Sequence, residues 1–508
     1  MIMGKRSPLL AACGVAGPLL ILCQWNLVLA FRNYAFFTGK PRIGERRVWR
    51  RTRAQNRGVA RLPRRVAAAE DEAGGDAGET WIDYNSFIIQ RPIDRVILDE
   101  GRGLRVHCLS DLHTDYKSNL AWVKTWPSWK GTEMAGLGEG HEDVLVVAGD
   151  VSSSPERLFE TLTDLKKRYD QVFFVVGNHD LWTRSRRNSS GGEDTSEEQE
   201  QTQRREEHDL GSVGKLVQIH QACESMGVRT NPAVFVLGGS GGGEENGTCV
   251  GGIRERGRQE VGVFPLLSWY HASWDDEPDL PPEDQFRNGD FFRRWGDFAY
   301  CRWPASLCSR EDFVTVSRDA QPVLANFFAR QNDACIEAFR ARKEETRARA
   351  GGASSSTVIS FSHFVPRQEL CPEKRFLSEP NLTKAIGSMP LERQVRELGS
   401  DLHVFGHTHI PIDMVREGVR YLQWPLGSVA EQSRQCKKMR EQGPLVVYSH
   451  DGRTGGLSPQ VPTFWGDYYR TYPRDTLETF VPEWALKRIR GRRRSDRPAA
   501  SGTLASDE

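Results

Sequence analysis

The sequence predicts an α/β fold, and three observations support this prediction. Apolar runs of four to six residues recur along the chain, each bounded by Gly, Asp or Asn, a pattern typical of buried strands. Segments with helical spacing separate the first three of these runs. Each run is also followed by a side chain of a metal-binding type, at the strand end where open α/β sheets place their ligands.

The first half of the folded region has a β-α-β-α-β pattern. We predict strands at residues 104–109, 144–148 and 172–176, and helices near residues 119–126 and 155–169. The second of these helices begins with a proline and continues with leucines at helical spacing, which supports its position.

The second half continues with helices and strands of similar length. We predict a helix at residues 213–226, a strand at 233–237 and a long charged helix at 320–349. Further strands are expected at residues 418–423 and 444–448.

Two segments interrupt this pattern and are predicted to be insertions in a domain that spans residues 79–489. Residues 184–208 are polar and lack periodicity, which predicts a disordered surface insertion. Residues 238–310 begin with a Gly-rich loop and continue with many aromatic residues, so they are expected to form the substrate region. Residues 490–508 are expected to be a disordered tail.

The N-terminal segment is expected to direct targeting and to lie outside the fold. Residues 1–30 have the basic start, apolar stretch and small residues near Ala30 of a secretory signal peptide. Residues 31–78 are rich in Arg, nearly free of acid at first, and end in an Ala/Gly-rich linker. Together they resemble the bipartite plastid presequence of algae with complex plastids. The alternative is a signal anchor at residues 9–31, which predicts a secretory or membrane-anchored protein and is the one source of membrane contact we expect.

The charge balance and the cysteine spacing argue against several classes of function. The chain has 69 Lys and Arg against 68 Asp and Glu, so no global field favours nucleic acid or a membrane. The ten cysteines are dispersed without a CxxC pair, which argues against a zinc ribbon or a thioredoxin-type motif. Most of them are expected to be buried free thiols.

Five segments place metal-binding side chains directly after a predicted strand. In chain order these side chains are Asp111 and His113, then Asp150, then Asn178 and His179, then His363, and finally His407 and His409. A carboxylate can bridge two cations about 3.5–4 Å apart, and imidazoles favour Zn, Fe or Mn over Ca or Mg. Each motif alone is weak, but the set in this order predicts a two-metal site.

The order of these motifs resembles that of the calcineurin-like metallophosphoesterase superfamily, whose pattern is DxH…GD…GNH[DE]…[GS]H…GHxH. The resemblance spans residues 111–409 and implies two facing mixed β-sheets flanked by helices. It also implies two sets of ligands: Asp111, His113, Asp150 and His409 for one metal, and Asp150, Asn178, His363 and His407 for the other. His179 would contact the substrate phosphate and protonate the leaving group.

The resemblance implies a binuclear metal-dependent phosphoesterase. It would hydrolyse a small phosphomonoester, nucleotide or phosphodiester by attack of metal-bound hydroxide, with two ions of Mn, Fe or Zn as cofactors. Asp150 and His179 are the expected catalytic residues. Asp180 is expected to cap the next turn, with the orientation of an imidazole as the alternative.

Differences from the motifs of two family branches limit the branch that this chain can resemble. The Asp-Arg-Gly extension of Ser/Thr protein phosphatases is missing after Asp150, and no Tyr stands there as in purple acid phosphatases. A nuclease with the same metal chemistry is the first alternative, but it needs a basic groove that the sequence does not indicate. A non-catalytic scaffold is the second, although such scaffolds lose ligands that are all present here.

Four residues are candidates for substrate contact. Trp269, Tyr270 and His271 lie in the aromatic segment, where rings can stack on a nucleobase or a hydroxyl can reach a phosphate. The alternative for this segment is an aromatic mini-core that stabilises a long insertion. Arg367 can pair with substrate oxygens, and a solvated surface arginine is the equal alternative.

Overall fold

The computed structural model describes residues 84, 86–125, 140–183, 197–238, 259–280, 291–349 and 356–487. All of them belong to one compact unit, Arg57–Glu508. The predicted signal peptide or anchor, the transit-like segment with its linker, and the tail lie outside the described residues, so targeting and the disorder of the tail stay predictions. Within the described ranges, no helix combines the length and the apolar character needed to cross a bilayer.

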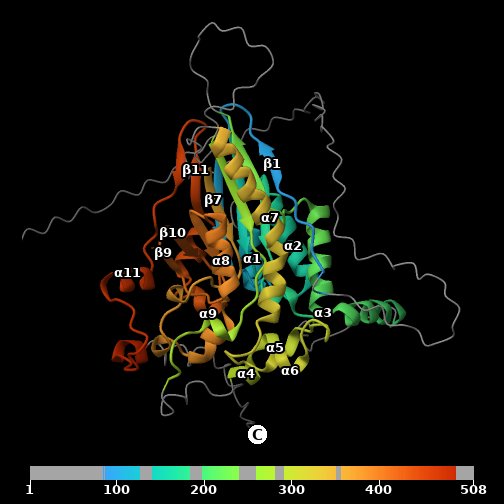
Figure 1. Cartoon of the computed structure of the whole chain (residues 1–508), viewed down its shortest axis with the longest axis vertical. Coiled ribbons are helices and arrows are strands. Elements are labelled where there is room, and N and C mark those ends of the chain that lie inside the picture. Colours follow the sequence, from blue (N-terminus) through green and yellow to red (C-terminus); the bar gives the residue numbers. More distant parts are fainter. Residues whose placement is uncertain are drawn as a thin grey trace, which may run out of the picture. The chain divides into compact units, whose positions relative to one another are not determined.

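The described strands form two mixed sheets (Figure 1). In spatial order, the seven-stranded sheet consists of β1 (Asp94–Ile97), β5 (Ala233–Leu237), β6 (Gln259–Pro265), β7 (Ser356–Phe361), β8 (Leu402–Phe405), β10 (Val419–Gln423) and β9 (Ile412–Arg416). The five-stranded sheet consists of β12 (Gly455–Leu457), β11 (Leu445–His450), β2 (Gly103–Leu109), β3 (His141–Ala148) and β4 (Gln171–Val175). The predicted architecture of two mixed sheets is confirmed.

Parallel pairing brings the ends of the motif-bearing strands together. In the five-stranded sheet, β2, β3 and β4 pair in parallel. In the other sheet, β7 and β8 pair in parallel. Because parallel strands end at the same edge of their sheet, the residues that follow them gather at that edge.

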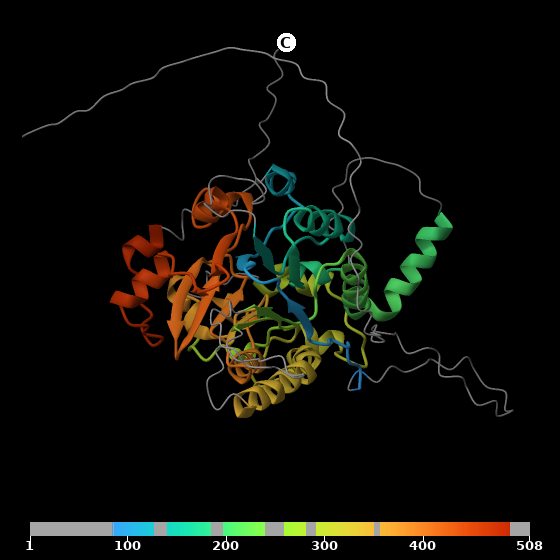
Figure 2. The ribbon, with the colours of Figure 1, turned by 90° about the horizontal axis from the view of Figure 1, so that it is seen from above.

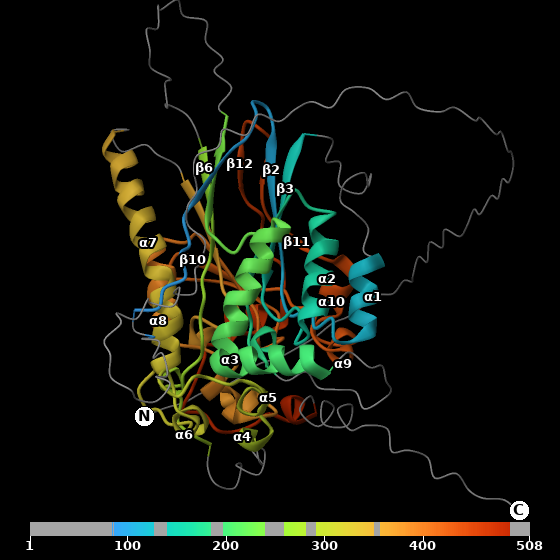
Figure 3. The same ribbon diagram turned by 90° about the vertical axis from the view of Figure 1, so that its right-hand side faces the viewer.

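Helices cover the outer faces of both sheets. In Figure 3, α1 (Lys117–Thr125) and α2 (Pro155–Lys166) lie on the outer side of the five-stranded sheet, and α7 (Val323–Arg349) and α8 (Met389–Leu398) lie on that of the seven-stranded sheet. Seen from above in Figure 2, α2 and α7 lie on opposite sides of the strands. The other described α-helices are α3 (Glu197–Met226), α4 (Phe291–Arg294), α5 (Gly296–Tyr300), α6 (Arg310–Val314), α9 (Val429–Gln432), α10 (Lys437–Gln442) and α11 (Phe464–Thr471).

Helix α2 shows how the sequence produces one of these covering elements. The hydroxyl of Ser154 accepts a hydrogen bond from the backbone N–H of Arg157 and so caps the helix, and a proline follows in the first turn. Spacing of three and four residues then turns one apolar face toward the sheet, formed by Leu158, Leu162 and Leu165. Full burial of each leucine contributes about 1.5–3 kcal/mol.

The buried side chains of both sheets form one continuous core. Strand β2 is buried along its whole length, and β3 and β4 are buried except at their first residue. Since helices cover one face of these strands and the other sheet covers the second face, their sequences are continuous apolar runs without alternation. The sequence pattern therefore reflects this layered arrangement.

Most predicted elements are confirmed. The β-α-β-α-β pattern corresponds to β2, α1, β3, α2 and β4, and the long charged helix is α7. The predicted strands of the second half are β5, β10 and β11. The seven described cysteines are buried, as expected: Cys108, Cys223, Cys301, Cys308, Cys335, Cys371 and Cys436.

The two predicted insertions differ from expectation. Residues 197–208, for which the sequence predicts disorder, are helical and belong to α3, in keeping with the high helix propensity of Glu, Gln and Arg. This helix is broken at Gly211, whose φ of 54° is accessible to glycine. The aromatic segment 238–310 contributes β6 to the middle of the larger sheet, so part of it belongs to the main fold.

We predict that a buried ion pair between β9 and β10 stabilises the edge of the larger sheet. Arg420 donates to both carboxylate oxygens of Asp413, at 2.8 and 2.6 Å, and both side chains are buried. Asp413→Ala leaves an unpaired buried cation, so the free energy of unfolding in urea should fall by roughly 3–5 kcal/mol. Glu441→Ala, which removes the exposed partner of Lys437, is the control and should cost less than about 1 kcal/mol. Equal losses in the two variants would contradict this role.

Candidate metal centre

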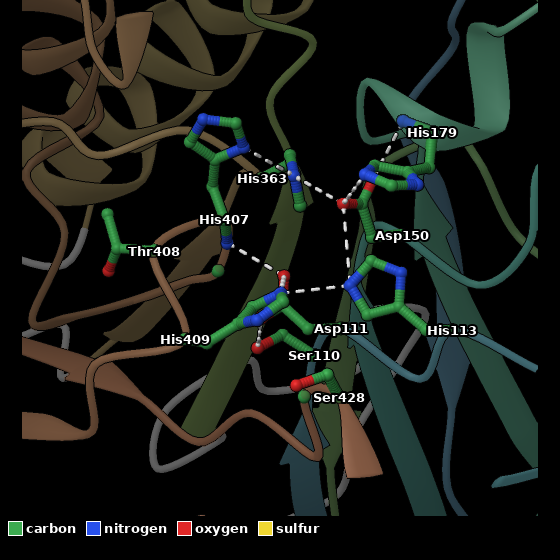
Figure 4. Close-up of polar contacts among 12 residues, drawn as sticks. Ser110, Asp111, His113, Asp150, His179, His363, His407, Thr408, His409 and Ser428 are labelled. Atoms are coloured by element: carbon green, nitrogen blue, oxygen red, sulfur yellow. Dashed lines mark hydrogen bonds and ion pairs between the residues drawn. The ribbon is translucent and has the colours of Figure 1, made fainter. Parts of the chain in front are cut away.

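The predicted ligands converge at the ends of strands from both sheets (Figure 4). Three groups have metal-binding atoms within 4.8 Å of one another: Asp111, His113 and His409; His113, Asp150 and His179; and Asp150, His363 and His407. His113 and His409, whose Nε2 atoms lie 2.9 Å apart, are separated by 296 residues in sequence. Their convergence is therefore a property of the fold.

One half of the centre contains three acceptor atoms that face one another. The amide oxygen of Asn178 lies 3.0 Å from both Nε2 of His363 and Nδ1 of His407, and these two nitrogens are 3.2 Å apart. The outer nitrogen of His363 lies 3.0 Å from the carbonyl oxygen of Ala148. The outer nitrogen of His407 lies 3.0 Å from that of Ala385. Because carbonyl oxygens only accept, the outer nitrogens carry the hydrogens and the inner ones present lone pairs.

The other half has the same organisation. Nε2 of His409 lies 2.9 Å from Nε2 of His113 and 3.4 Å from Oδ1 of Asp111. The outer nitrogen of His409 donates to Oε2 of Glu431 at 2.7 Å, which turns the lone pair of the inner nitrogen toward the other two groups. Asp111 also accepts hydrogen bonds from the hydroxyl of Ser110 and from the backbone N–H of His407.

Asp150 lies between the two halves. Its Oδ2 is 3.4 Å from Nε2 of His363 and 3.8 Å from Nε2 of His113. Carboxylates and imidazoles with lone pairs turned inward suit Zn, Fe or Mn, and a carboxylate between two such groups suits a bridge. The residues present therefore fit two cations with Asp150 between them.

The backbone at these positions is unusual. Six described residues other than glycine have positive φ, and five of them are predicted ligands: Asp111 (55°), His113 (42°), Asp150 (54°), His407 (77°) and His409 (53°). Each such conformation in a residue with a Cβ costs of order 1 kcal/mol and clusters at functional sites. The backbone strain is therefore concentrated at the residues whose side chains turn toward the metal centre.

Two motif glycines permit the close approach of the loops. A Cβ at Gly149 would collide with the ring of His363, and a Cβ at Gly177 would collide with the carboxylate of Asp150. Any larger residue at either position would push a ligand out of place. The glycines that precede Asp150 and Asn178 are therefore steric requirements of the centre.

Asp180 joins two of the ligand loops. Its buried carboxylate accepts four backbone hydrogen bonds of 2.8–3.0 Å, from the N–H groups of Asp150, Val151, Ser152 and Gly177. The expected cap of the next turn is not what these bonds form, since all four donors precede Asp180 in the chain and three of them belong to the loop that carries Asp150.

The electrostatics of the ring nitrogens match this packing. Burial lowers the pKa of His363, but the carboxylate of Asp150 raises it to about 9. Burial, followed by the charge on His363, lowers the pKa of His407 to about 3. Among the protein groups, a single proton is thus held where three acceptors meet, and a cation can take that place.

His179 lies at the side of the centre. Its backbone N–H donates to Oδ1 of Asp150 at 2.9 Å, and its Nε2 lies 3.9 Å from Oδ2 of the same residue. The ring stacks on Trp182 with centroids 3.7 Å apart. Its side chain is 29% exposed, against 18% for His409 and 0% for His363, so the ring of His179 is accessible to a substrate.

Two of the four candidate substrate residues are not presented to a substrate. Trp269 is 1% exposed, and its ring packs against Tyr270, Trp303, Phe328 and Phe364. No face of this ring is left for a ligand, so Trp269 belongs to an aromatic mini-core.

Arg367 is likewise occupied by protein groups. Its guanidinium forms ion pairs with Glu369, Glu392 and Glu417 and is 13% exposed. Three carboxylates compensate its charge, which leaves it unsuited to bind substrate oxygens.

The other two candidates lie in the same segment. The ring of Tyr270 stacks over that of His407 at 6.4 Å, and its hydroxyl accepts a hydrogen bond from Trp295. Trp295 itself lies edge-on to His407 at 5.8 Å. Nδ1 of His271 accepts the backbone N–H of Ser273 and caps a short 3₁₀ helix. Tyr270 thus borders the centre, whereas His271 has a local structural contact.

Sequence reasoning missed two carboxylates that contact predicted ligands. Asp297, in α5, accepts a hydrogen bond from the amide nitrogen of Asn178 at 2.7 Å. Burial raises its pKa to about 6. Glu431, in α9, holds His409, and its sequence signal is the capping box that it forms with Ser428. No local pattern marks Asp297, which lies 119 residues from Asn178.

We predict that Asp180 stabilises the chain through its four backbone hydrogen bonds. Asp180→Asn turns an amide NH₂ toward two buried N–H donors, so the free energy of unfolding should fall by roughly 1–3 kcal/mol for each unsatisfied group. Asp451→Ala is the control, because Asp451 accepts two backbone N–H groups in an exposed turn. Urea unfolding of both variants checks the prediction, and a loss at Asp451 as large as that at Asp180 would contradict it.

Comparison with known proteins supports the reading of these motifs. Residues 104–260 match the family model of the calcineurin-like phosphoesterases. The acyl-carrier-protein phosphodiesterase PptH of Mycobacterium tuberculosis is 34% identical over 79 residues, which are 15% of this chain and 21% of that protein. The matched segment thus spans about a fifth of the length of that relative.

Two solved structures are similar over longer stretches. The phosphopantetheinyl hydrolase PptH from Mycobacterium tuberculosis is similar over 66% of this chain and 93% of its own, with 20% identity and a TM-score of 0.33. A putative 5′-nucleotidase from Staphylococcus aureus, in complex with alpha-ketoglutarate, is similar over 77% of this chain and 58% of its own, with 11% identity and a TM-score of 0.26.

The family match includes the first three motifs, which carry Asp111, Asp150 and Asn178. The motifs of His363 and His407 lie beyond it in sequence, and the fold brings them to the same place. Residues 104–260 are therefore similar to the calcineurin-like phosphoesterases over the part of the chain that carries the first three motifs.

Proposed function

We propose that this protein is a binuclear metal-dependent phosphoesterase that hydrolyses a small phosphomonoester, nucleotide or phosphodiester. The observation that carries the proposal is the convergence of lone pairs from Asn178, His363 and His407 within 3.2 Å of one another. Three acceptors at such distances repel one another unless a positive charge lies between them. The proton that Asp150 keeps on His363 supplies one such charge, and a bound cation can take its place.

The chemistry proposed for this site depends on two kinds of groups. Two bound cations of Mn, Fe or Zn supply Lewis acidity, which activates water and offsets charge on the phosphoryl oxygens. Asp150 would belong to the ligand sets of both cations, and the other ligands would be Asp111, His113, Asn178, His363, His407 and His409.

His179 is proposed to be the general acid. Its ring is partly exposed at the edge of the centre, and its backbone is tied to Asp150, so its distance from the metals is fixed. Stacking on Trp182 fixes the plane of the ring. Burial lowers the pKa of His179 to about 3, so its ring is neutral before substrate binds. We propose that the negative charge of a bound phosphate raises this pKa, which lets the ring donate a proton to the departing oxygen.

The two alternative functions have less support. A non-catalytic scaffold does not need a complete set of inward-facing ligands, and here every position of the motif set is filled. A nuclease needs a basic groove beside the metals. Arg367, the arginine proposed from the sequence for substrate contact, is paired with three glutamates, which does not favour a polyanionic substrate.

We predict that the protein hydrolyses at least one phosphate ester in a metal-dependent manner. The full-length protein is assayed against nucleotides, sugar phosphates, small phosphodiesters and an acyl carrier protein that carries phosphopantetheine, because the curated relative is named for that last activity. Activity should disappear with a chelator and return with Mn²⁺, Zn²⁺ or Fe²⁺. Asp150→Ala, which removes the bridging carboxylate, is the inactive control. Turnover that survives complete removal of metal would exclude the proposed centre.

We predict that His179→Ala lowers kcat about 10²- to 10⁴-fold, the usual contribution of a general acid. Metal content should stay at the wild-type level, because His179 is not among the proposed ligands. Turnover and metal stoichiometry are measured on the same sample. An unchanged kcat would remove His179 from the mechanism, and a loss of metal would make it a ligand.

A further inference from the structure

Two carboxylates lie directly behind the proposed ligands, and neither belongs to a metal-binding motif. Glu431 accepts a hydrogen bond from Nδ1 of His409, and Asp297 accepts one from the amide nitrogen of Asn178, each at 2.7 Å. His409 belongs to one half of the centre and Asn178 to the other. Each half thus has one carboxylate behind it.

The position of Glu431 is set by its own helix. It is the third residue of α9, and its Oε2 accepts hydrogen bonds from both the backbone N–H and the hydroxyl of Ser428. Gln435 donates to the other oxygen at 3.2 Å. With the carboxylate fixed in this way, His409 must place its hydrogen on Nδ1, and its Nε2 faces His113.

The position of Asp297 decides which atom Asn178 presents. The two ends of an amide have almost the same shape, so the side chain of Asn178 can turn either its oxygen or its NH₂ group toward His363 and His407. A carboxylate accepts hydrogen bonds and cannot donate them. Asp297 therefore holds the NH₂ group and leaves the oxygen facing the imidazoles. The reverse orientation would place two hydrogens where a cation is proposed to bind.

Asp297 also supports the ring beneath His179. The oxygen that accepts from Asn178 accepts as well from the indole N–H of Trp182, at 2.8 Å, and Trp182 stacks on His179. The side chain of Asp297 is fully buried. Among the described residues, no lysine or arginine forms an ion pair with it. A buried carboxylate bonded to neutral donors is costly unless positive charge lies nearby, and the proposed cation beyond Asn178 supplies such charge.

We propose that Asp297 and Glu431 are positioning residues, each of which serves one of the two metal subsites. Asp297 orients Asn178 in the subsite shared with His363 and His407. Glu431 orients His409 in the subsite shared with Asp111 and His113. The inference rests on the proposed function of the centre as a two-metal site. Loss of such a supporting partner typically weakens metal binding 10- to 100-fold.

The test is a titration of the full-length protein with Mn²⁺ alone. Binding is measured by calorimetry and by electron paramagnetic resonance. Asp297→Asn and Glu431→Gln keep the shape of each side chain and remove its charge. Each variant should weaken one of the two Mn²⁺ sites about 10- to 100-fold and change the other less than about threefold. Glu373→Gln is the control, because Glu373 is a buried carboxylate that bonds Tyr469 away from the centre, and both Mn²⁺ affinities should stay unchanged.

Double variants assign each carboxylate to its subsite. Asp297→Asn should add no further loss of Mn²⁺ affinity to Asn178→Ala, while its effect should add to that of His409→Ala. Glu431→Gln should show the opposite dependence. A loss of both Mn²⁺ affinities in every background would overturn the assignment. It would mean either that the variant has lost structure generally or that each carboxylate acts on both subsites.

The outcome separates this inference from the proposed function. If the wild type binds two Mn²⁺ ions and neither variant loses one selectively, the positioning roles are wrong and the two-metal site stands. If the losses are selective but no phosphate ester is hydrolysed, the positioning roles stand and the proposed enzymatic activity is wrong.

Discussion

The hydrogen bond from Nδ1 of His363 to the carbonyl oxygen of Ala148 joins the two sheets at the point where their strands end. It connects residues 215 positions apart in the chain. The bond requires the ring to lie against Gly149, where any Cβ would collide with it. It also decides that the other ring nitrogen faces inward with its lone pair. This one hydrogen bond therefore fixes both the packing of the two sheets at this edge and the orientation of the His363 ring.

The loops around this bond hold an unfavourable backbone in place. Five ligand positions have positive φ, and each costs of order 1 kcal/mol or more. The opposing contributions are hydrogen bonds: Asp180 binds four backbone N–H groups, and the side chain of Gln423 bonds Gly406 and Ile410 beside the last motif. In these loops, buried polar side chains therefore form hydrogen bonds with backbone groups that helices and strands pair with one another elsewhere in the fold.

Much of this arrangement could be predicted from the sequence, and the limits have physical causes. The motif residues follow apolar strands, and they lie close together in the structure because parallel pairing brings such strand ends to one edge. Strand β6 was missed because Gly262 and Pro265 interrupt its apolar pattern and a Gly-rich stretch precedes it. Trp269 is a candidate for ligand contact on sequence alone, because a sequence does not distinguish an exposed indole from a buried one. Asp297 was missed because its role depends on a contact across 119 residues, with no local pattern.

Asp297 lies two residues from Trp295, whose ring contacts that of His407, so a neighbour of His407 and the support of Asn178 belong to the same few residues of chain. A segment from a relative could not be grafted here to change the choice of substrate unless it brought an acid to the same point. Under the proposed function, changes in this segment that alter the choice of substrate would therefore also alter the affinity for the cation.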